Sequence, residues 1–176
     1  MRKFNSIYGE TLTEPKIILS KTPRLVGTDG KNKMSKSLGN TIYLSDDENE
    51  IERKVMTMFT DPNHLRISDP GNTKNNPVFA YLDAFGRDKE KIAAMKAHYE
   101  KGGLGDVAVK RYLNEVLQEM LKPIREKRKN LENNMDYIYK VACEGTEKAR
   151  KITSQTLEKV KKQMQIDYEE IQKAAP

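Results

Sequence analysis

Apolar residues recur at helical spacing from about residue 45 onward, and clusters of Asp, Asn, Pro and Gly separate these stretches. Ser45 followed by Glu48 predicts a capping box at the start of a first helix, which Asp61-Pro62 ends. After a long loop, a second helix is expected from Pro77, because proline suits the first helical position. The apolar positions expected to face a core here are Ile51, Val55, Met58 and Phe59, then Val78, Phe79, Leu82 and Phe85.

The same periodicity continues to the end of the chain. Asp88 is expected to cap a helix that Gly102-Gly103 ends, and a longer helical segment opens near Gly105-Asp106. The expected apolar faces are Ile92, Met95 and Tyr99, then Val109, Tyr112, Val116, Met120 and Ile124, then Leu131, Met135, Ile138 and Ala142, and finally Ile152, Leu157, Val160, Met164, Tyr168 and Ile171. A helix-bundle core explains these faces without any cofactor.

Two residues are expected to interrupt the long carboxyl-terminal helices. Pro123 should kink or divide its helix, because proline removes a backbone donor and crowds the preceding turn. Gly145 is a natural stop, so the last helix is expected from about Thr146 to Lys173.

Residues 1–45 differ from the rest of the chain and consist of turns and short extended pieces. Lys16–Leu19 and Leu25-Val26 are strand candidates, but each is too short to form a sheet alone. The pattern therefore predicts a mainly α fold, with residues 46–176 forming a helical domain and residues 1–45 forming the remnant of another domain.

Composition excludes several classes of protein. The single cysteine, Cys143, excludes an internal disulfide and a multi-cysteine metal cage, and His64 and His98 alone give a metal centre few ligands. No stretch is apolar enough for a membrane span. Together with the single cysteine, this makes a reducing, cytoplasmic setting the expected one. The two histidines, with Asp61 and Asp69 beside prolines, are expected to be structural rather than catalytic.

The positive charge is concentrated in two regions. The chain has 32 Lys and Arg against 26 Asp and Glu, a net charge of +6. Residues 1–45 hold eight basic and three acidic residues, and Lys122–Lys151 holds nine basic and five acidic residues. This distribution indicates a polyanionic partner such as nucleotide phosphate or RNA, although Lys-rich helices can also be simply solvated.

The segment from Gly27 to Asn40 carries the candidate chemistry. It combines lysines, serines and glycines between a strand candidate and a helix, which is a set of groups suited to holding phosphate oxygens. The spacing does not match a Walker A loop. A flexible, solvated turn remains the alternative on composition alone.

The pentapeptide Lys33-Met34-Ser35-Lys36-Ser37 resembles the KMSKS signature loop of class I aminoacyl-tRNA synthetases. Its surroundings resemble bacterial-type tryptophanyl-tRNA synthetase. The matching segments are Phe4–Gly9, Gly27–Gly30, Leu38–Asn40, Thr60–Pro62, Asp69–Gly71, Asn76–Phe79, Gly105-Asp106 and Leu121–Glu126. The family's early His-x-Gly-His type motif and its tryptophan pocket are absent, so the chain resembles the carboxyl-terminal half of the enzyme.

This resemblance implies ATP-dependent activation of tryptophan and its transfer to tRNA-Trp. It implies that residues 1–45 are the end of a Rossmann-like catalytic domain and that residues 46–176 are an anticodon-binding type helical bundle. Lys33 and Lys36 would be the catalytic residues that neutralise the departing pyrophosphate. The residues implied to bind ATP, which the full-length enzyme uses with Mg²⁺, are Leu25, Lys33, Met34, Ser35, Lys36 and Ser37; Val26 would also offer backbone to the adenine.

The resemblance also implies partners. A homodimer is expected, with no membrane or DNA partner, and the isolated chain is expected to be inactive because half of the ATP site is missing. The candidate RNA-phosphate track comprises Arg125, Lys127, Arg128, Lys129 and Lys140. Two alternatives remain open, namely a non-catalytic RNA-binding module that keeps the loop as a relic, and a purely structural dimerisation unit.

Overall fold

The computed structural model describes residues 1–168, and within this range the chain is helical with no β-strand. It divides into two units. The loop-bearing unit is Leu19–Asn130, and the terminal unit combines Met1–Ile18 with the chain from Leu131 onward. Both strand predictions are wrong for these residues, because the only described β pairing is a single antiparallel bridge between Val26 and Lys33.

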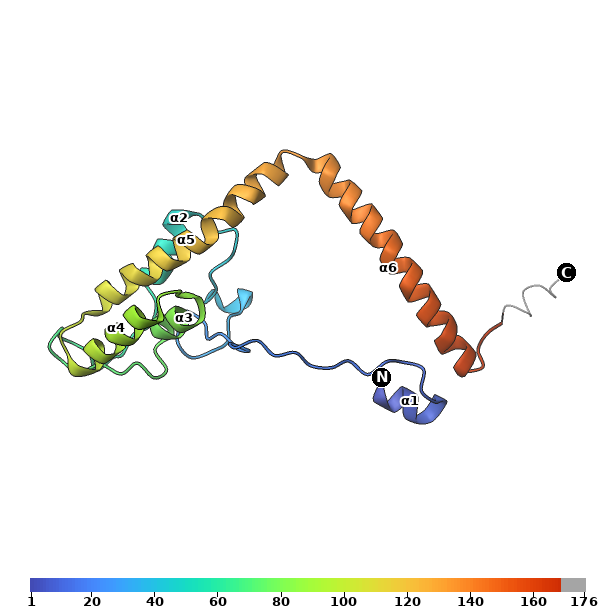
Figure 1. Cartoon of the computed structure of the whole chain (residues 1–176), viewed down its shortest axis with the longest axis horizontal. Coiled ribbons are helices and arrows are strands. Elements are labelled where there is room, and N and C mark those ends of the chain that lie inside the picture. Colours follow the sequence, from blue (N-terminus) through green and yellow to red (C-terminus); the bar gives the residue numbers. More distant parts are fainter. Residues whose placement is uncertain (169–176) are drawn as a thin grey trace. The chain divides into compact units, whose positions relative to one another are not determined.

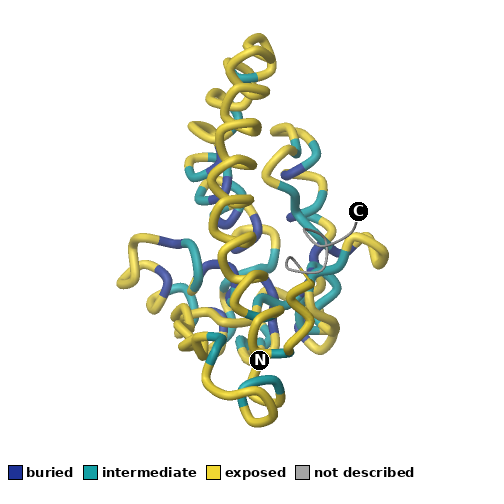
Figure 2. The backbone as a smooth tube through the Cα atoms, turned by 90° about the vertical axis from the view of Figure 1, so that its right-hand side faces the viewer, coloured by how far each residue is buried: buried dark blue, intermediate teal, exposed yellow. Residues whose placement is uncertain are grey.

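The core of the loop-bearing unit is built from four helices, α2 (Glu48–Met56), α3 (Pro77–Phe85), α4 (Lys89–Lys101) and most of α5 (Asp106–Glu132) (Figure 1). Figure 2 colours the buried residues dark blue along the backbone. The buried apolar side chains of these helices, together with that of Met58 just after α2, form one cluster. The members of this cluster are Ile51, Val55, Met58, Val78, Phe79, Tyr81, Leu82, Ile92, Tyr99, Val109, Leu113, Leu117 and Leu121. Most of the predicted positions on α2, α3 and α4 are therefore confirmed, whereas Phe59, Phe85 and Met95 are not fully buried.

Side-chain caps define where three of these helices begin. The predicted cap Asp88 is confirmed, because it accepts a hydrogen bond from the Lys91 N–H at 2.8 Å. Pro77 occupies the first turn of α3 as predicted, and the Asn76 side chain caps this helix by accepting from the Val78 N–H at 3.0 Å. The predicted capping box at Ser45 is wrong, because the Asp47 carboxylate caps α2 by accepting from the Glu50 N–H at 2.8 Å.

Helix α5 differs from the prediction in its register and at Pro123. Its buried apolar residues are Val109, Leu113, Leu117 and Leu121, whereas Tyr112, Val116 and Met120 only border the core. The helix continues through Pro123 to Glu132, so Pro123 does not divide it.

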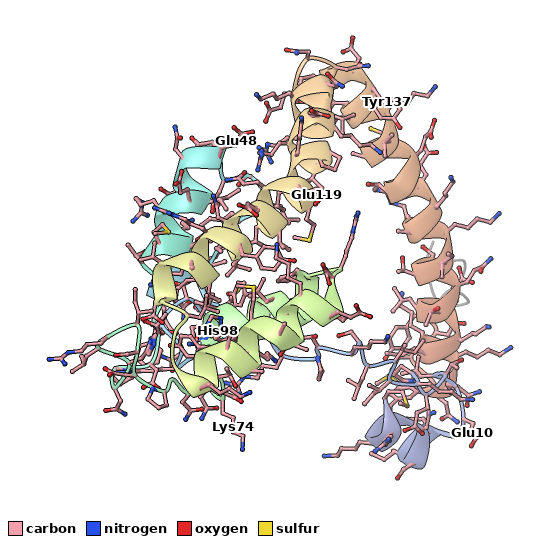
Figure 3. All side chains as sticks on the ribbon, turned by 60° about the vertical axis from the view of Figure 1, so that its left-hand side comes forward. Glu10, Glu48, Lys74, His98, Glu119 and Tyr137 are labelled. Atoms are coloured by element: carbon pink, nitrogen blue, oxygen red, sulfur yellow. The ribbon has the colours of Figure 1, made fainter. Side chains whose placement is uncertain are left out.

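The loop over residues 60–76 is held against α4 and α5 by a partly buried polar network. The Tyr99 hydroxyl donates to the Asp106 carboxylate at 2.7 Å, and the His64 ring nitrogen Nδ1 lies 3.3 Å from the same oxygen. His64 is buried and packs against the Tyr99 ring, while His98 is exposed on α4 (Figure 3). These contacts explain His64 as a structural residue.

The terminal unit contains α1 (Arg2–Tyr8) and α6 (Met135–Gln163). Gly145 does not stop α6, and Asn134 caps its start by accepting from the Tyr137 N–H at 3.2 Å. No residue of α6 is buried, so the apolar face predicted there forms no core within the described chain. The helix ends ten residues before Lys173, and Ile171 and Lys173 lie outside the described residues.

Candidate functional site

The segment Gly27–Asn40, hereafter the lysine loop, is closed by backbone hydrogen bonds at its base. The Gly27 N–H donates to the Asn32 carbonyl at 2.7 Å, and the Thr28 N–H donates to the Asn40 carbonyl at 3.0 Å. A 3₁₀ turn, η1 (Lys36–Leu38), lies near its far end, and Gly39 follows it in the left-handed region at φ 66°. Glycine suits this position because other L-residues rarely adopt such a backbone conformation.

Two polar side chains lie inside the lysine loop. The Asp29 carboxylate accepts hydrogen bonds from the N–H groups of Lys31 and Asn32 and from the side-chain amides of Asn32 and Asn40. Desolvation opposes ionisation of Asp29, but these hydrogen bonds outweigh it and lower the pKa of the carboxyl group. The lysine loop therefore holds a negative charge in place through four hydrogen bonds.

The lysine loop is attached to the helical core at two points. The Tyr81 hydroxyl of α3 donates to the Val26 carbonyl at 2.9 Å, and the Phe59 N–H donates to the Thr28 carbonyl at 2.9 Å. Burial, followed by the nearby charge of Asp29, raises the pKa of Tyr81, so its hydroxyl stays protonated and able to donate. Leu25, Val26 and Met34 also pack against the core cluster.

The predicted catalytic lysines lie exposed on this attached loop. Neither Lys33 nor Lys36 forms an ion pair with any residue in the described part of the chain. The hydroxyl oxygens of Ser35 and Ser37 lie 2.9 Å apart. The Ser35 N–H already donates to the Asn40 side-chain oxygen at 2.8 Å, so this backbone donor is occupied.

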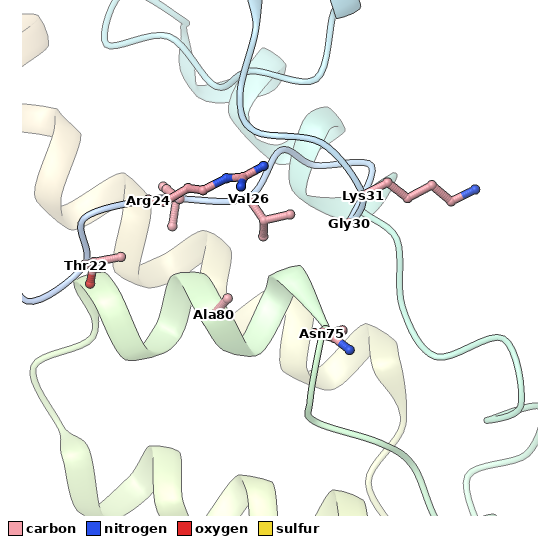
Figure 4. A pocket seen from close by; sticks show the side chains of 8 residues that line it. Thr22, Arg24, Val26, Gly30, Lys31, Asn75 and Ala80 are labelled. Atoms are coloured by element: carbon pink, nitrogen blue, oxygen red, sulfur yellow. The ribbon is translucent and has the colours of Figure 1, made fainter.

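A cleft of about 610 Å³ lies beside the base of the lysine loop (Figure 4). Val26, just before the lysine loop, and Ala80, on α3, point toward one another across this cleft. Its lining residues are Thr22, Arg24, Leu25, Val26, Gly30, Lys31, Asn75 and Ala80. The cleft thus combines an apolar floor with two cationic side chains, an arrangement that suits a molecule with an apolar body and negative charge.

Of the residues predicted to bind ATP, Leu25 and Val26 line this cleft. The pentapeptide Lys33–Ser37 lies outside its lining. Sequence reasoning missed Arg24 and Asn75 as lining residues; Asn75 has φ 64° and comes from a loop distant in sequence, so no local pattern indicates it.

The predicted RNA-phosphate track is largely engaged within the protein. The Arg125 guanidinium lies 3.0 Å from the Glu48 carboxylate at the start of α2, and the Arg125 side chain is only 12% exposed. Lys140 lies 4.0 Å from Glu144, and Arg128 and Lys129 also have interaction partners. Arg125 is therefore structural rather than available to RNA, which leaves Lys127 as the freest member of the predicted track.

Two kinds of site do not occur within residues 1–168. No group of three or more His, Cys, Asp or Glu side chains is arranged to hold a metal ion. In the same range, every helix is too short or too polar to traverse a lipid bilayer.

Comparison with known proteins places these features in a family. The model of "tRNA synthetases class I (W and Y)" matches residues 1–122. Tryptophan–tRNA ligase of Clostridium longisporum is 52% identical over 171 residues, which cover 96% of this chain and 50% of that protein. The corresponding ligase of Streptococcus mutans is 51% identical over 174 residues, which cover 96% of this chain and 51% of that protein.

A solved structure agrees with the sequence matches. The structure of tryptophanyl-tRNA synthetase from Campylobacter jejuni, complexed with ADP and tryptophan, matches this chain with a TM-score of 0.70 and 31% sequence identity. The match covers 93% of this chain and 50% of the Campylobacter chain. The chain spans about half the length of the curated relatives that it matches. The family model, the curated relatives and this structure agree, and the chain belongs to the class I tRNA synthetases of the tryptophan and tyrosine family.

Proposed function

We propose that this chain is the carboxyl-terminal half of a tryptophan–tRNA ligase, which activates tryptophan with ATP and transfers it to tRNA-Trp. Residues 1–45 are the end of a Rossmann-like catalytic domain carrying the KMSKS loop, and residues 46–176 are the helical tRNA-binding domain. Relatives about 50% identical to this chain are named tryptophan–tRNA ligase, which supports this reaction. The observation that carries the proposal is the pair of exposed, unpaired cations, Lys33 and Lys36, on a loop tied to the core.

The lysines act on the leaving group of the first step. The tryptophan carboxylate attacks the α-phosphorus of ATP, and the bond between this phosphorus and the bridging oxygen to the β-phosphate breaks. Negative charge then accumulates on the departing pyrophosphate. Lys33 and Lys36 stabilise this charge more strongly than the charge of bound ATP, so they lower the barrier rather than merely tightening binding.

The cleft beside the loop receives the nucleoside end of ATP. Leu25 and Val26 offer an apolar surface and backbone groups, while Arg24 and Lys31 attract the phosphates. Mg²⁺ commonly arrives bound to substrate phosphates, and residues 1–168 provide no three-ligand protein site for it. No residue of this chain is therefore assigned to Mg²⁺, and the role of the lysines is derived from their charge alone.

Tryptophan-dependent exchange of pyrophosphate into ATP tests the proposal. The assay uses a chimera in which this chain replaces the matched half of the Clostridium longisporum ligase. Lys33→Ala and Lys36→Ala should each lower kcat by about 30- to 1,000-fold, the scale of losing about 2–4 kcal/mol of transition-state stabilisation. Lys101→Ala, an exposed lysine at the end of α4, is the matched control and should leave kcat unchanged.

Two results would count against this function. An active chimera that is insensitive to both lysine substitutions would favour the alternative of an RNA-binding module that keeps the loop as a relic. Exchange by the isolated 176-residue chain at the rate of the chimera would contradict the proposal that half of the ATP site is missing.

We propose that tRNA contacts two separate groups of exposed cations, the lysines of α6 in the terminal unit and Lys127 in the loop-bearing unit. Lys148, Lys151 and Lys159 are exposed on α6, which contributes nothing to a buried core. Replacing them together with Lys127 by Ala should weaken tRNA-Trp binding and reduce its dependence on salt, because phosphate contacts release counterions. Binding that keeps its full salt dependence would mean that other residues contact the phosphates, whereas no salt-dependent binding before substitution would favour the structural dimerisation unit. Light scattering would measure the expected homodimer directly.

A further inference from the structure

The side chains of Asp29 and Asn40, here called the clasp, join the two ends of the lysine loop. The Asn40 amide nitrogen Nδ2 donates to the Asp29 carboxylate at 3.1 Å and to the Lys33 carbonyl at 3.2 Å. The Asn40 oxygen Oδ1 accepts from the Ser35 N–H at 2.8 Å. One side chain therefore holds backbone atoms on both sides of Met34.

In the clasp, Asn40 is buried and Asp29 is partly buried, although the flanking lysines are exposed. Asn40 is only 3% exposed, whereas Lys33 and Lys36 face solvent. A buried amide that loses its partners costs free energy, so the native state favours the conformation in which all of these bonds form. The orientation of the amide is also determined, because a flipped Asn40 would place its oxygen against a carboxylate and a carbonyl.

Gly27 leaves the space that the clasp requires. A Cβ atom at this position would lie 2.2 Å from the Asn40 amide nitrogen and 3.0 Å from an Asp29 carboxylate oxygen. Any larger residue at position 27 would therefore displace Asn40. The backbone on both sides and the two clasp side chains form one interlocked unit.

We propose that Asp29 and Asn40 are positioning residues that hold Lys33 and Lys36 in place for the transition state. The inference rests on the proposed function of the lysine loop and adds to it the device that orders the loop. By fixing the Lys33 carbonyl and the Ser35 N–H, the clasp determines the directions in which the flanking lysine side chains leave the backbone. Neither clasp side chain needs to contact ATP, because both act through the backbone that they bind.

Asn40→Asp tests the clasp with almost no change of shape. The new carboxylate faces the Asp29 carboxylate and the Lys33 carbonyl without a proton to donate, so the clasp opens. In the chimera, kcat for pyrophosphate exchange should fall by about 10- to 100-fold, the scale of a 1 Å misplacement, with the KM for tryptophan unchanged. Asn49→Asp adds the same charge at an exposed position of α2 and should leave kcat unchanged.

The double variant Asp29→Asn/Asn40→Asp provides a rescue. It exchanges the two partners, so an amide at position 29 can again donate to a carboxylate at position 40. The carboxylate at position 40 still faces the Lys33 carbonyl, so we expect the double variant to recover part, but not all, of the kcat lost by Asn40→Asp. An undiminished kcat in Asn40→Asp, or a double variant with a kcat no higher than that of Asn40→Asp, would overturn the proposal.

Amide hydrogen exchange in the 176-residue chain separates this inference from the proposed function. Asn40→Asp should accelerate exchange in Lys33–Ser37 by at least about 10-fold, and the double variant should restore protection. If Lys33→Ala and Lys36→Ala leave the chimera fully active, the proposed function fails while exchange still decides whether the clasp orders the loop. If they lower kcat but exchange in Asn40→Asp is unchanged, the clasp fails alone.

Discussion

Tyr81 connects the lysine loop to helix α3 through one hydrogen bond, from its buried hydroxyl to the Val26 carbonyl. Tyr81→Phe keeps the ring in the core and removes only this donor. The half-buried carbonyl of Val26 then loses its partner, so unfolding should become easier by about 1 kcal/mol. Urea denaturation followed by circular dichroism measures this change.

Tyr137→Phe is the matched control for the hydroxyl of Tyr81. Tyr137 lies on α6 with 52% of its surface exposed (Figure 3), so water can satisfy its hydroxyl group. Its replacement should leave the urea midpoint unchanged. Equal effects of the two substitutions would show that the bond to Val26 contributes nothing to stability.

The residue types in the lysine loop predicted the charge of the candidate site, but they did not predict the hydrogen bonds inside it. The lysines and serines of the pentapeptide are adjacent in the sequence, so their shared chemistry is visible there. Asp29 and Asn40 are separated by 11 positions, and only the folded loop brings them within 3.1 Å. The same limit applies to Asn75, which reaches the cleft from the far end of the loop over residues 60–76.

At the scale of elements, helix α2 is stabilised at its first turns by an ion-pair network around Glu50. The Arg53 guanidinium donates to the Glu50 carboxylate at 2.7 and 2.8 Å, and the Lys54 ammonium lies 3.5 Å away. The hydrogen bond from Arg53, followed by the charges of Arg53 and Lys54, outweighs desolvation and lowers the pKa of Glu50 to about 2. The ionised form of Glu50 is therefore favoured in the folded chain.

This shift predicts how stability depends on pH in acid. Because the folded pKa of Glu50 is lower than the unfolded one, its contribution is present above pH 4.5 and is lost as pH falls toward 2. Glu50→Gln should remove this part of the acid dependence. Melting temperatures between pH 2 and 7 measure it, with Glu52→Gln on the same helix as the control; identical pH profiles for Glu50→Gln and the wild type would contradict the prediction.

The start of a helix was predictable where one residue in the sequence clearly marks it. Pro77 marks the first turn of α3 and Asp88 directly precedes α4, and both helices begin there. Before α2, Ser45 and Asp47 both offer a capping oxygen, and the local sequence does not decide between them. Asp46 is engaged with Tyr43 and Lys54, which leaves Asp47 to cap the helix.

The buried face of α5 was ambiguous for a similar reason. Tyr112, Val116 and Met120 repeat every four residues, and so do Leu113, Leu117 and Leu121 one position later. Both rows are apolar, and packing against the other helices decides which row is innermost. Pro123 is exposed on this helix, where the lost backbone bond is tolerated because water can reach the freed carbonyl.

At the scale of the whole chain, the two units differ in how they bury apolar surface. All 13 buried apolar residues of the core cluster lie between Ile51 and Leu121, inside the loop-bearing unit. Helix α6 of the terminal unit has no buried residue, and Ile152 and Leu157 along it are exposed. Stability from apolar burial therefore resides in the loop-bearing unit.

This difference predicts that the chain can be shortened without loss of its core. A chain ending at residue 134 lacks α6 but retains every residue of the core cluster and all of the lysine loop. Its free energy of unfolding, from urea titration of the core tyrosine signals, should stay within about 0.5 kcal/mol of the full chain, as for changes away from buried contacts. A fall of more than about 1 kcal/mol would mean that α6 stabilises the core through contacts absent from this burial pattern, because deletion of a solvated helix exposes no new apolar surface.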